Sequence, residues 1–285
     1  SICDFASSDS WVILSPIEQS IKRKIEAVGT PLKDWDINIY RGVLTGCNEA
    51  FIIDTKKRNE ILANCQSDEE RKRTDELIRP ILRGRDIKRY GYVDNGLFLI
   101  NTHNGVKGKI PRVDINDFPA VKAHLDQYWD KISIRSDKGD TPYNLRNCAY
   151  LEDFFKPKVM YPNMTKFIPF YYDEKGFYQN DKSFMITGNH VAYLTAFLNS
   201  SLFKFCFLNN FPELQGGTRE LRKLFFDKIP VKKISDEIND SFIPIIEDIQ
   251  RDYSRQKALK IDTMLSDLYN LTLEERLTIG FVEIL

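Results

Sequence analysis

The sequence has 285 residues, of which 42% are hydrophobic and 29% are charged; this composition predicts a folded core and excludes a disordered chain. The 41 Lys and Arg residues balance the 41 Asp and Glu residues, so the formal net charge is zero. The balance is uneven, because residues 235–285 carry eleven acids and five bases and residues 1–234 carry the other 36 bases and 30 acids. The excess of bases in residues 1–234 favours an anionic partner for this part of the chain. The alternative is that the excess reflects chance variation in charge among solvent-exposed faces.

Neither a membrane protein nor a secreted protein is indicated. The sequence has no apolar run near the roughly 20 residues that span a bilayer, and its first residues do not resemble a signal peptide. The five cysteines are scattered, which is typical of reduced thiols in a cytoplasmic protein and not of a zinc site. Because the chain does not begin with Met, we expect it to be a piece of a longer protein.

The first predicted element is a helix over residues 15–29. Ser15 and Glu18 have the spacing of a capping box, and Gly29 is a stop signal. The apolar stripe expected on this helix consists of Ile17, Ile21, Ile25 and Val28.

The remaining elements follow from periodicity. Alternating or short apolar runs predict strands at residues 35–39, 50–55, 97–101, 158–162, 167–173 and 183–187, with the run at 50–55 pairing with that at 35–39. Helical spacing is found at residues 67–78, 117–132, 190–210 and 236–268, and a capping box at Thr272 and Glu275 begins a last helix. We expect Pro80 to end the second helix, residues 190–210 to form one buried helix or two broken ones, and residues 236–268 to form one long helix with an acidic outer face.

Together these elements predict an α/β (α+β) fold with a mixed, largely antiparallel sheet, peripheral helices and a long C-terminal helix. We place a domain boundary near residues 230–236. Residues 1–234 then form the main domain, and residues 235–285 form a helical segment that packs on it or on another domain.

The sequence shows no recognisable active site. His103, His124 and His190 lie outside any metal-binding or triad motif, and a phosphate-binding loop and a nucleophile elbow are both missing. The acids at 152–155 and 173–176 do not have the pattern of a metal-dependent nuclease and are expected to be surface residues. We therefore predict no catalytic residue and no metal ligand in this chain.

Basic, glycine-containing loops are the most informative feature. They occur at residues 40–51, 79–92, 105–112, 134–146 and 215–223. Glycine lets a backbone approach a partner, Lys and Arg bind phosphates, and Arg, Asn and Gln can read base edges. Candidate DNA-binding residues in these loops, and in the turn-rich region 163–180, are Arg41, Thr45, Asn48, Arg83, Arg85, Lys88, Arg89, Lys107, Lys109, Lys166, Gln215, Thr218, Arg219 and Arg222.

The order of these stretches resembles the C-terminal specificity region of TaqI-like DNA adenine methyltransferases, as found in type IIG restriction–modification enzymes. The turn "RGVLTGCNEAF" (41–51) is similar to the family's R-G-x-x-T-G-x-N-x-A-F, and "IRPILRGRDIKRY" (78–90) is similar to its I-x-P-x-L-R-G-x-D-I-x-R-Y. Further similar stretches follow in order at "FFKPKVMYPNM", "AYLTAFLNSSLFKF", "ELQGGTRELRKLFFDKIPV" and "IDTMLSDLYNLTLEE".

The resemblance implies a target recognition domain that grips double-stranded DNA beside a methyltransferase domain of the same polypeptide. It implies S-adenosylmethionine as the cofactor of the longer parent enzyme, with magnesium as a further candidate where the parent also cleaves DNA. This chain has neither the N-P-P-[YF] tetrapeptide nor the cofactor-binding loop of the methyltransferase, so we expect the fragment itself to be non-catalytic and to hold no cofactor.

Three alternatives stay open. The acidic C-terminal helix could make the chain a protein-interaction module that docks onto a methyltransferase or nuclease subunit. The chain could be a nuclease with an unrecognised site. The arginines of "LRGRDI" (82–87) could brace the fold, with Asp86 paired to an arginine and the glycine packed tightly, instead of contacting DNA.

Overall fold

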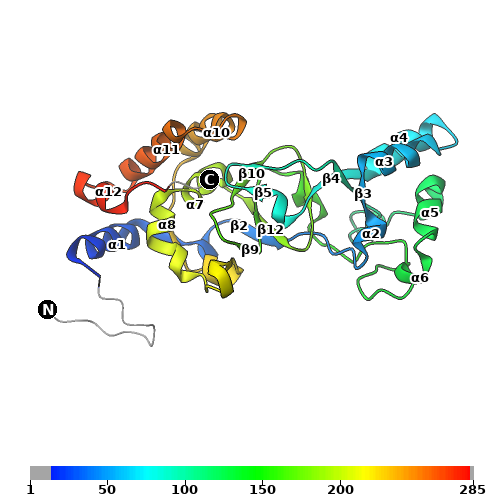
Figure 1. Ribbon diagram of the computed structural model, residues 1–285, viewed down its shortest axis with the longest axis horizontal. Coiled ribbons are helices and arrows are strands. Elements are labelled where there is room, and N and C mark those ends of the chain that lie inside the picture. Colours follow the sequence, from blue (N-terminus) through cyan, green and yellow to red (C-terminus); the bar gives the residue numbers. More distant parts are fainter. Residues whose placement is uncertain (1–13, 283–285) are drawn as a thin grey trace.

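A four-stranded antiparallel sheet lies at the middle of the molecule, in the order β10 (Tyr171–Asp173), β8 (Lys158–Pro162), β12 (Ser183–Gly188) and β2 (Ile37–Arg41). The computed structural model describes residues 14–282 and is elongated, with this sheet between a helical end and a smaller lobe (Figure 1). Met185 of β12 lies opposite Met160 of β8 and Tyr40 of β2. Val159, Met160 and Tyr161 are fully buried, so β8 is covered on both faces.

The lobe is built on a second sheet, in the order β11 (Tyr178–Gln179), β4 (Ile78–Leu82), β7 (Leu97–Ile100) and β3 (Ile52–Asp54). The pairing of β11 with β4 is parallel and the others are antiparallel. Its helices are α2 (Asn48–Phe51), α3 (Thr55–Ala63), α4 (Asp68–Leu77), α5 (Pro119–Asp126) and α6 (Trp129–Ile132). The lobe has a core of its own, which includes Phe51, Ile78, Leu99, Val121 and Leu125.

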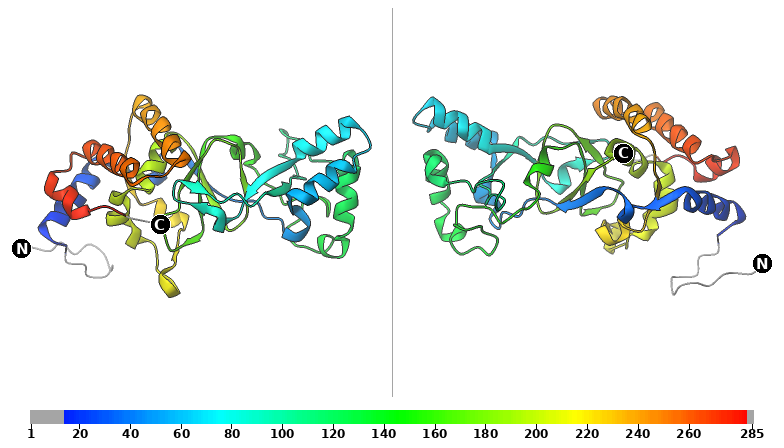
Figure 2. Two further views of the ribbon diagram at one scale, coloured as in Figure 1. Left: turned by 45° about the horizontal axis from the view of Figure 1, so that its top comes forward. Right: turned by 180° about the vertical axis from the view of Figure 1, so that it is seen from behind.

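The opposite end of the molecule is helical (Figures 1 and 2). It contains α1 (Pro16–Val28), α7 (Val191–Leu198), α8 (Ser201–Phe207), α9 (Lys223–Phe226), α10 (Asp236–Arg251), α11 (Arg255–Leu268) and α12 (Leu273–Ile279). Helix α7 packs on β8 with one side and on α10 with another. Phe242, Ile246 and Ile249 of α10 are fully buried, and each such side chain contributes about 1.5–3 kcal/mol to stability.

Three two-stranded ribbons complete the fold. They are β1 (Gly29–Pro31) with β14 (Pro230–Lys232), β5 (Ile87–Lys88) with β6 (Gly91–Tyr92), and β9 (Met164–Thr165) with β13 (Arg219–Glu220). The first ribbon joins residues that are about 200 positions apart in the sequence, since Thr30 lies opposite Val231. The predicted α/β fold class, with a largely antiparallel sheet and peripheral helices, is confirmed.

Local signals predicted both capped helix starts correctly. The capping box of Ser15 and Glu18 begins α1, and that of Thr272 and Glu275 begins α12. On α1, Ile21 and Ile25 are buried as expected, whereas Val28 is exposed at the end of the stripe.

Several element predictions were wrong. Residues 50–55 are not one strand beside β2, because residues 48–51 are helical, β3 pairs with β7, and β2 pairs with β12. Helix α4 ends at Leu77, before Pro80 as expected, but the strand β4 that follows and includes Pro80 was not predicted. The helix expected over residues 117–132 is two short helices, α5 and α6.

The expected long helix over residues 236–268 is also interrupted. Helix α10 ends at Arg251, where Asp252 has an extended backbone, and α11 begins after Ser254, whose side chain accepts from the Lys257 N–H. Because the Ser254 side chain caps the start of α11, α10 and α11 are separate helices, although the apolar periodicity continues across the break. Residues 190–210 likewise form two helices, α7 and α8, with Ser200 capping the second.

The C-terminal helices share a core with the rest of the helical end, since Ile246 and Ile261 lie in one cluster with Ile21 and Tyr161. The domain boundary near residue 235 stays a prediction. No single helix within residues 14–282 is long and apolar enough to cross a membrane, and α7 with Ser201–Asn210 meets the length and composition criterion only as a pair bent by 68°.

Candidate nucleic-acid interface

The basic segment 79–92 folds as β4, a one-turn 3-10 helix (Gly84–Asp86) and the β5–β6 hairpin. The Arg83 guanidinium donates from Nε to Asp86 Oδ2 at 2.9 Å and from Nη2 to Oδ1 at 3.0 Å, and the Arg83 backbone N–H donates to Oδ2 at 2.9 Å. Burial raises the pKa of Asp86, but these hydrogen bonds outweigh burial and leave the pKa below its ordinary value. A Cβ on Gly84 would lie 2.4 Å from the Lys182 carbonyl oxygen, so only glycine fits here. The bracing role considered for this motif is therefore what Arg83, Gly84 and Asp86 perform.

The other cations of this segment divide into two groups. Arg89 donates to the Asn199 carbonyl oxygen at 2.8 Å and to the Tyr253 hydroxyl at 3.3 Å, so it ties the hairpin to the helical end. Arg85 is exposed and has neither an ion pair nor a side-chain hydrogen bond within residues 14–282, and the exposed Lys88 donates to the Arg85 carbonyl oxygen at 2.8 Å. Arg79 is half-buried, and its guanidinium lies 5.0 Å from the centre of the Phe155 ring. Arg85 and Lys88 are thus the exposed cations of this segment that remain available to a phosphate.

The turn at residues 41–51 is held mainly by internal contacts. A Cβ on Gly42 would lie 2.0 Å from the Asn180 carbonyl oxygen, which explains the glycine. Thr45 is 2% exposed, and its hydroxyl donates to the Asn48 side chain at 2.6 Å. Asn48 and Arg41 are exposed, and Arg41 pairs with Asp181 at 3.5 Å. Of these candidates, Thr45 is placed to shape the turn, whereas Asn48 and Arg41 face solvent.

Arg135 is a site residue that the sequence reasoning missed. It is 6% exposed, and its guanidinium donates to the backbone carbonyl oxygens of Thr45, Asp137, Pro142 and Asn144 while lying 4.5 Å from the centre of the Phe51 ring. Burial lowers its pKa to about 10. Arg135 therefore joins the loop 134–146 to the turn 41–51, and since all its partners are carbonyls no sequence motif reveals the connection.

The β9–β13 ribbon brings together two loops that are about 50 residues apart in the chain. Arg219 lies opposite Thr165, and a Cβ on Gly216 would lie 3.9 Å from Lys166 Nζ. Lys166 and Gln215 are exposed, Thr218 is half-buried, and the exposed Arg222 pairs with Glu220 at 2.7 Å. Arg219 is half-buried and donates to the Phe211 carbonyl oxygen at 2.7 Å, so it braces the loop.

Apolar side chains stand exposed on the same ribbon. Met164, Phe167 and Leu214 are 51%, 60% and 40% exposed. The Phe167 turn is fixed by Thr165, whose hydroxyl donates to the Phe167 carbonyl oxygen at 2.6 Å and accepts from the Phe167 N–H at 3.0 Å. The ribbon therefore exposes apolar side chains beside cations. These three residues were not among the predicted site residues, since short apolar runs between turns are usually core.

The loop 105–112 is separate from the ribbon. Lys107 is exposed at its tip, where Val106 and Ile110 form a bridge, and it has no ion pair among the described residues. Lys109 pairs with Glu152.

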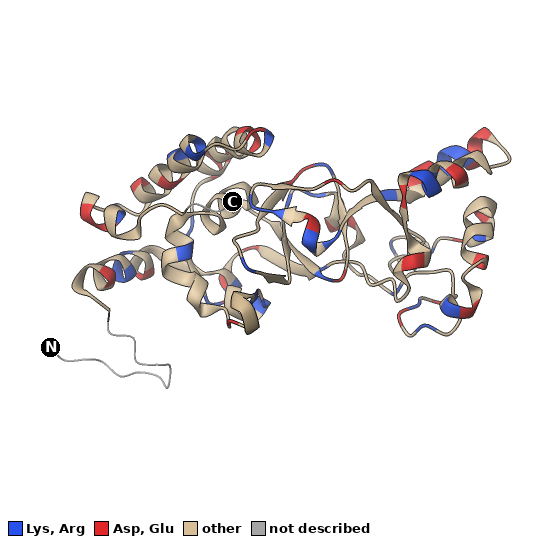
Figure 3. Cartoon of the chain, in the orientation of Figure 1, with Lys and Arg blue, Asp and Glu red and all other residues tan. Residues whose placement is uncertain are grey.

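Lys and Arg are interspersed with Asp and Glu over most elements (Figure 3), in agreement with the many ion pairs. The structure thus gathers Lys166, Gln215, Thr218, Arg219 and Arg222 in one place, and Arg41, Thr45 and Asn48 in another.

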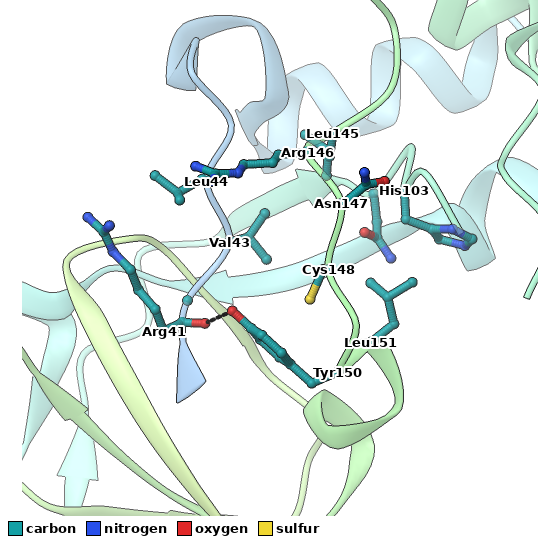
Figure 4. A pocket seen from close by; sticks show the side chains of 12 residues that line it. Arg41, Val43, Leu44, His103, Leu145, Arg146, Asn147, Cys148, Tyr150 and Leu151 are labelled. Carbon is teal, nitrogen blue, oxygen red and sulfur yellow. Dashed lines mark hydrogen bonds between the residues drawn. The ribbon is translucent and has the colours of Figure 1, made fainter. Parts of the chain in front are cut away.

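The described residues also contain a pocket beside the turn 41–51, with a volume of about 280 Å³ (Figure 4). Its walls come from residues 41–44 and 145–151 together with Asn101 and His103. Within residues 14–282, no group of three His, Cys, Asp or Glu side chains is arranged to hold a metal ion.

The architecture is that of an α/β protein built on two four-stranded sheets with peripheral helices. The model of the TaqI-like C-terminal specificity domain family matches residues 79–231, more than half of the chain, and the protein therefore belongs to this family.

Two solved structures share the fold. The type IIG restriction endonuclease BpuSI is similar over 93% of this chain, with 16% sequence identity and a TM-score of 0.54. The type IIL restriction-modification enzyme MmeI, solved in complex with DNA, is similar over 85% of this chain, with 11% identity and a TM-score of 0.54. This chain spans about a third of each of those chains, 33% and 34% respectively.

Proposed function

We propose that this chain is the DNA target-recognition part of a longer adenine-specific DNA methyltransferase of a restriction–modification system, and that it is non-catalytic by itself. One observation carries the proposal: within the family-matched region, the β9–β13 ribbon gathers exposed cations, an exposed amide and exposed apolar side chains. Family membership and the fold shared with restriction enzymes support the same conclusion.

The ribbon has the chemistry that a duplex requires. Lys166 and Arg222 contact phosphates, and Gln215 and Thr218 reach base edges. The major groove admits a two-stranded ribbon, and its thymine methyl groups and base faces offer apolar contacts to Phe167 and Met164. Arg85, Lys88 and Lys107 are further phosphate contacts in this proposal.

The partner domain and the cofactor belong to the parent enzyme. The upstream methyltransferase domain of the same polypeptide binds S-adenosylmethionine and modifies the adenine, while this chain holds the register on double-stranded DNA. Neither the cofactor nor magnesium is assigned to residues of this chain.

Binding of a labelled DNA duplex to the 285-residue chain, measured by fluorescence anisotropy over a series of salt concentrations, tests the proposal. Contacts to six phosphates predict a slope of about −5 for the logarithm of affinity against that of salt concentration. Salt-insensitive binding, or none at low salt, would contradict it. Magnesium-dependent cleavage by the purified chain would contradict the non-catalytic part.

One observation favours protein interaction as a second candidate function. The apolar face of α10 is covered by α7, but Leu273 and Leu277, one turn apart on α12, are each 73% exposed. These leucines could contact another domain or subunit. If the double variant Leu273→Glu, Leu277→Glu binds DNA as the wild type does, the two surfaces are independent.

A further inference from the structure

Two hollows adjoin one another where the central sheet meets the lobe. The larger has a volume of about 280 Å³ and lies beside residues 41–44 and 145–151. The smaller has a volume of about 210 Å³ and is lined by Arg79, Phe155 and Tyr178 among others. Asn101, His103 and Leu151 line both hollows, so the two share a wall. Ligand pockets in proteins begin at roughly 300 Å³, which makes the pair large enough for one small molecule.

The shared wall carries a polar atom without a partner. Asn101 is 7% exposed, and its Nδ2 donates to the Tyr178 hydroxyl at 3.0 Å, but its buried Oδ1 accepts no hydrogen bond within the described residues. A buried acceptor without a partner is energetically unfavourable.

His103 supplies the complementary donor. The Gly105 backbone N–H donates to His103 Nδ1 at 3.2 Å, and burial lowers the pKa of His103, so the neutral ring carries its proton on Nε2. Asn101 and His103 line both hollows, so an amide and an imidazole, groups that hydrogen-bond to nucleobase edges, lie in the shared wall.

Two arginines stand at the rim of the larger hollow. The guanidinium groups of Arg41 and Arg146 extend toward the same side of it, in the view of Figure 4. Both side chains are exposed, and their carboxylate partners are Asp181 at 3.5 Å and Asp137 at 3.1 Å. A guanidinium group at an open rim can bind a phosphate in a bidentate manner.

The rest of the larger hollow suits a flat ring. Tyr150 stacks on Tyr40 with ring centres 4.1 Å apart and an interplanar angle of 6°, and its hydroxyl donates to the Arg41 carbonyl oxygen at 2.9 Å. Its ring is therefore held in place beside Val43 and Leu44. Aromatic side chains fixed in this way serve as stacking surfaces for bases.

We propose that the two hollows bind one nucleotide, with the base against Tyr150 and the shared wall and the phosphate at Arg41 and Arg146. The nucleotide has two possible sources, a free mononucleotide or a nucleotide turned out of a DNA duplex, and only the second source rests on the proposed function.

The first arm of the test is calorimetric titration of the 285-residue chain with dAMP. We expect saturable binding that weakens about tenfold in Arg146→Ala, because a charge-assisted hydrogen bond is lost. The matched control is Arg112→Ala: Arg112 also pairs with an aspartate, Asp140 at 3.4 Å, but does not line either hollow, and its substitution should leave dAMP binding unchanged. Asn101→Leu should weaken binding as well, and circular dichroism checks that this variant is folded. If Asn101→Leu is unfolded, the test rests on Arg146→Ala, which is at an exposed position.

The second arm uses a duplex that contains 2-aminopurine, whose fluorescence rises when the base leaves the stack. A rise that is lost in Arg146→Ala while duplex affinity changes little supports the duplex as the source. Saturable dAMP binding without such a rise supports a free mononucleotide. Absence of dAMP binding together with fluorescence that does not depend on Arg146 would overturn the proposal. If the chain binds dAMP but does not show salt-dependent binding of a duplex, the proposed function is contradicted and the proposed nucleotide pocket is not.

Discussion

Lys158 and Asp173 form an ion pair that is completely shielded from solvent. Lys158 Nζ lies 2.5 Å from Asp173 Oδ2, neither side chain is exposed, and the two residues are direct partners across strands β8 and β10. Asp173 Oδ2 also accepts from the Phe177 N–H at 3.0 Å, and Lys158 donates to the Phe154 carbonyl oxygen. The pair therefore joins the central sheet to the segment that leads into β11. The expectation that the acids at 173–176 are surface residues was wrong for Asp173, which is completely buried.

Removing one partner of this pair should be strongly destabilising. We expect Asp173→Leu or Lys158→Met to lower the free energy of unfolding by about 3–5 kcal/mol, because each leaves a buried charge without its partner. Urea denaturation monitored by circular dichroism measures the loss. The double variant Lys158→Met, Asp173→Leu should be closer to the wild type than either single variant, and a purely additive double variant would show that the two residues do not act as a pair.

Substitution of Arg83 should affect stability, whereas substitution of Arg85 should affect DNA binding. We expect Arg83→Ala to lower the free energy of unfolding by about 1.5–3 kcal/mol, since it removes the charged partner of Asp86, and Arg85→Ala to leave stability unchanged but weaken duplex binding. Because the pKa of Asp86 is lowered in the folded state, its contribution is present above the ordinary aspartate pKa and is lost as the pH falls through the folded value. The difference in stability between wild type and Asp86→Asn should accordingly shrink below about pH 4. Equal effects of the two arginine substitutions on unfolding would be evidence against the brace.

Glu275 should make the contact between α12 and α1 sensitive to acid. Its carboxylate lies 2.7 Å from Lys24 Nζ and accepts from Ser20 and from the Thr272 N–H. Burial raises its pKa, but these partners outweigh burial and lower the pKa to about 2. Its stabilising effect is therefore present above the ordinary pKa of 4.5 and is lost as the pH falls from there toward 2. We expect Glu275→Gln to cost about 1–3 kcal/mol at pH 7 and less at pH 3, as measured by urea denaturation at both pH values. A cost that does not change with pH would argue against the ionised carboxylate.

Lys166 and Phe167 should affect DNA binding in different ways. Removing one phosphate contact in Lys166→Ala should make the salt slope less steep by about 0.9 and weaken binding to all sequences alike. Phe167→Ala should keep the salt slope and lower affinity, because it removes only apolar contact. Lys72→Ala is the control, since Lys72 is exposed on α4, far in the sequence from the ribbon. Loss of binding equal to that of Lys166→Ala in this control would mean that the effect is general electrostatics.

Arg135 should not be replaceable by lysine. Its guanidinium donates to four carbonyl oxygens, a geometry that a single ammonium group cannot reproduce. We expect Arg135→Lys to lower the free energy of unfolding by about 3 kcal/mol or more, measured by denaturant unfolding. Arg146→Lys, at an exposed ion pair, is the comparison and should change stability by less than about 1 kcal/mol. Full stability of Arg135→Lys would show that the four contacts contribute little.

Signals within a few residues of each other were read correctly from the sequence, and pairings across the chain were not. The capping boxes of α1 and α12 are local, and both were predicted. The neighbour of β2 is β12, about 145 residues away, and no local pattern distinguishes it from the nearer candidate at residues 50–55. The break at Ser254 escaped because apolar spacing alone does not show where one helix ends and the next begins.

The candidate site shows the same difference between local sequence signals and long-range contacts. Composition identified the basic loops, but not which of their cations are occupied by internal partners, as Arg83 and Arg89 are. The partners of Arg89, which include Asn199 and Tyr253, are distant in sequence, whereas Arg83 pairs with the nearby Asp86, a pairing that was among the alternatives considered. Arg135 could not be identified because backbone carbonyls are its partners, and the exposure of Phe167 depends on the pairing of β9 with β13.

The pairing of β1 with β14 places the start and the end of the sheet-bearing region side by side, with Gly29 opposite Lys232. The residues between these two strands form one continuous segment, which leaves and returns to a helical base made of α1 and α10–α12. If such a region were exchanged between relatives as a cassette, both splice points would lie at a single place on the base. The exchange would have to preserve several contacts with the base, among them those of Tyr193 with Phe242, Ser201 with Asp262 and Arg89 with Tyr253. New binding specificities could then arise by replacement of the cassette while the base and its attachment stay the same.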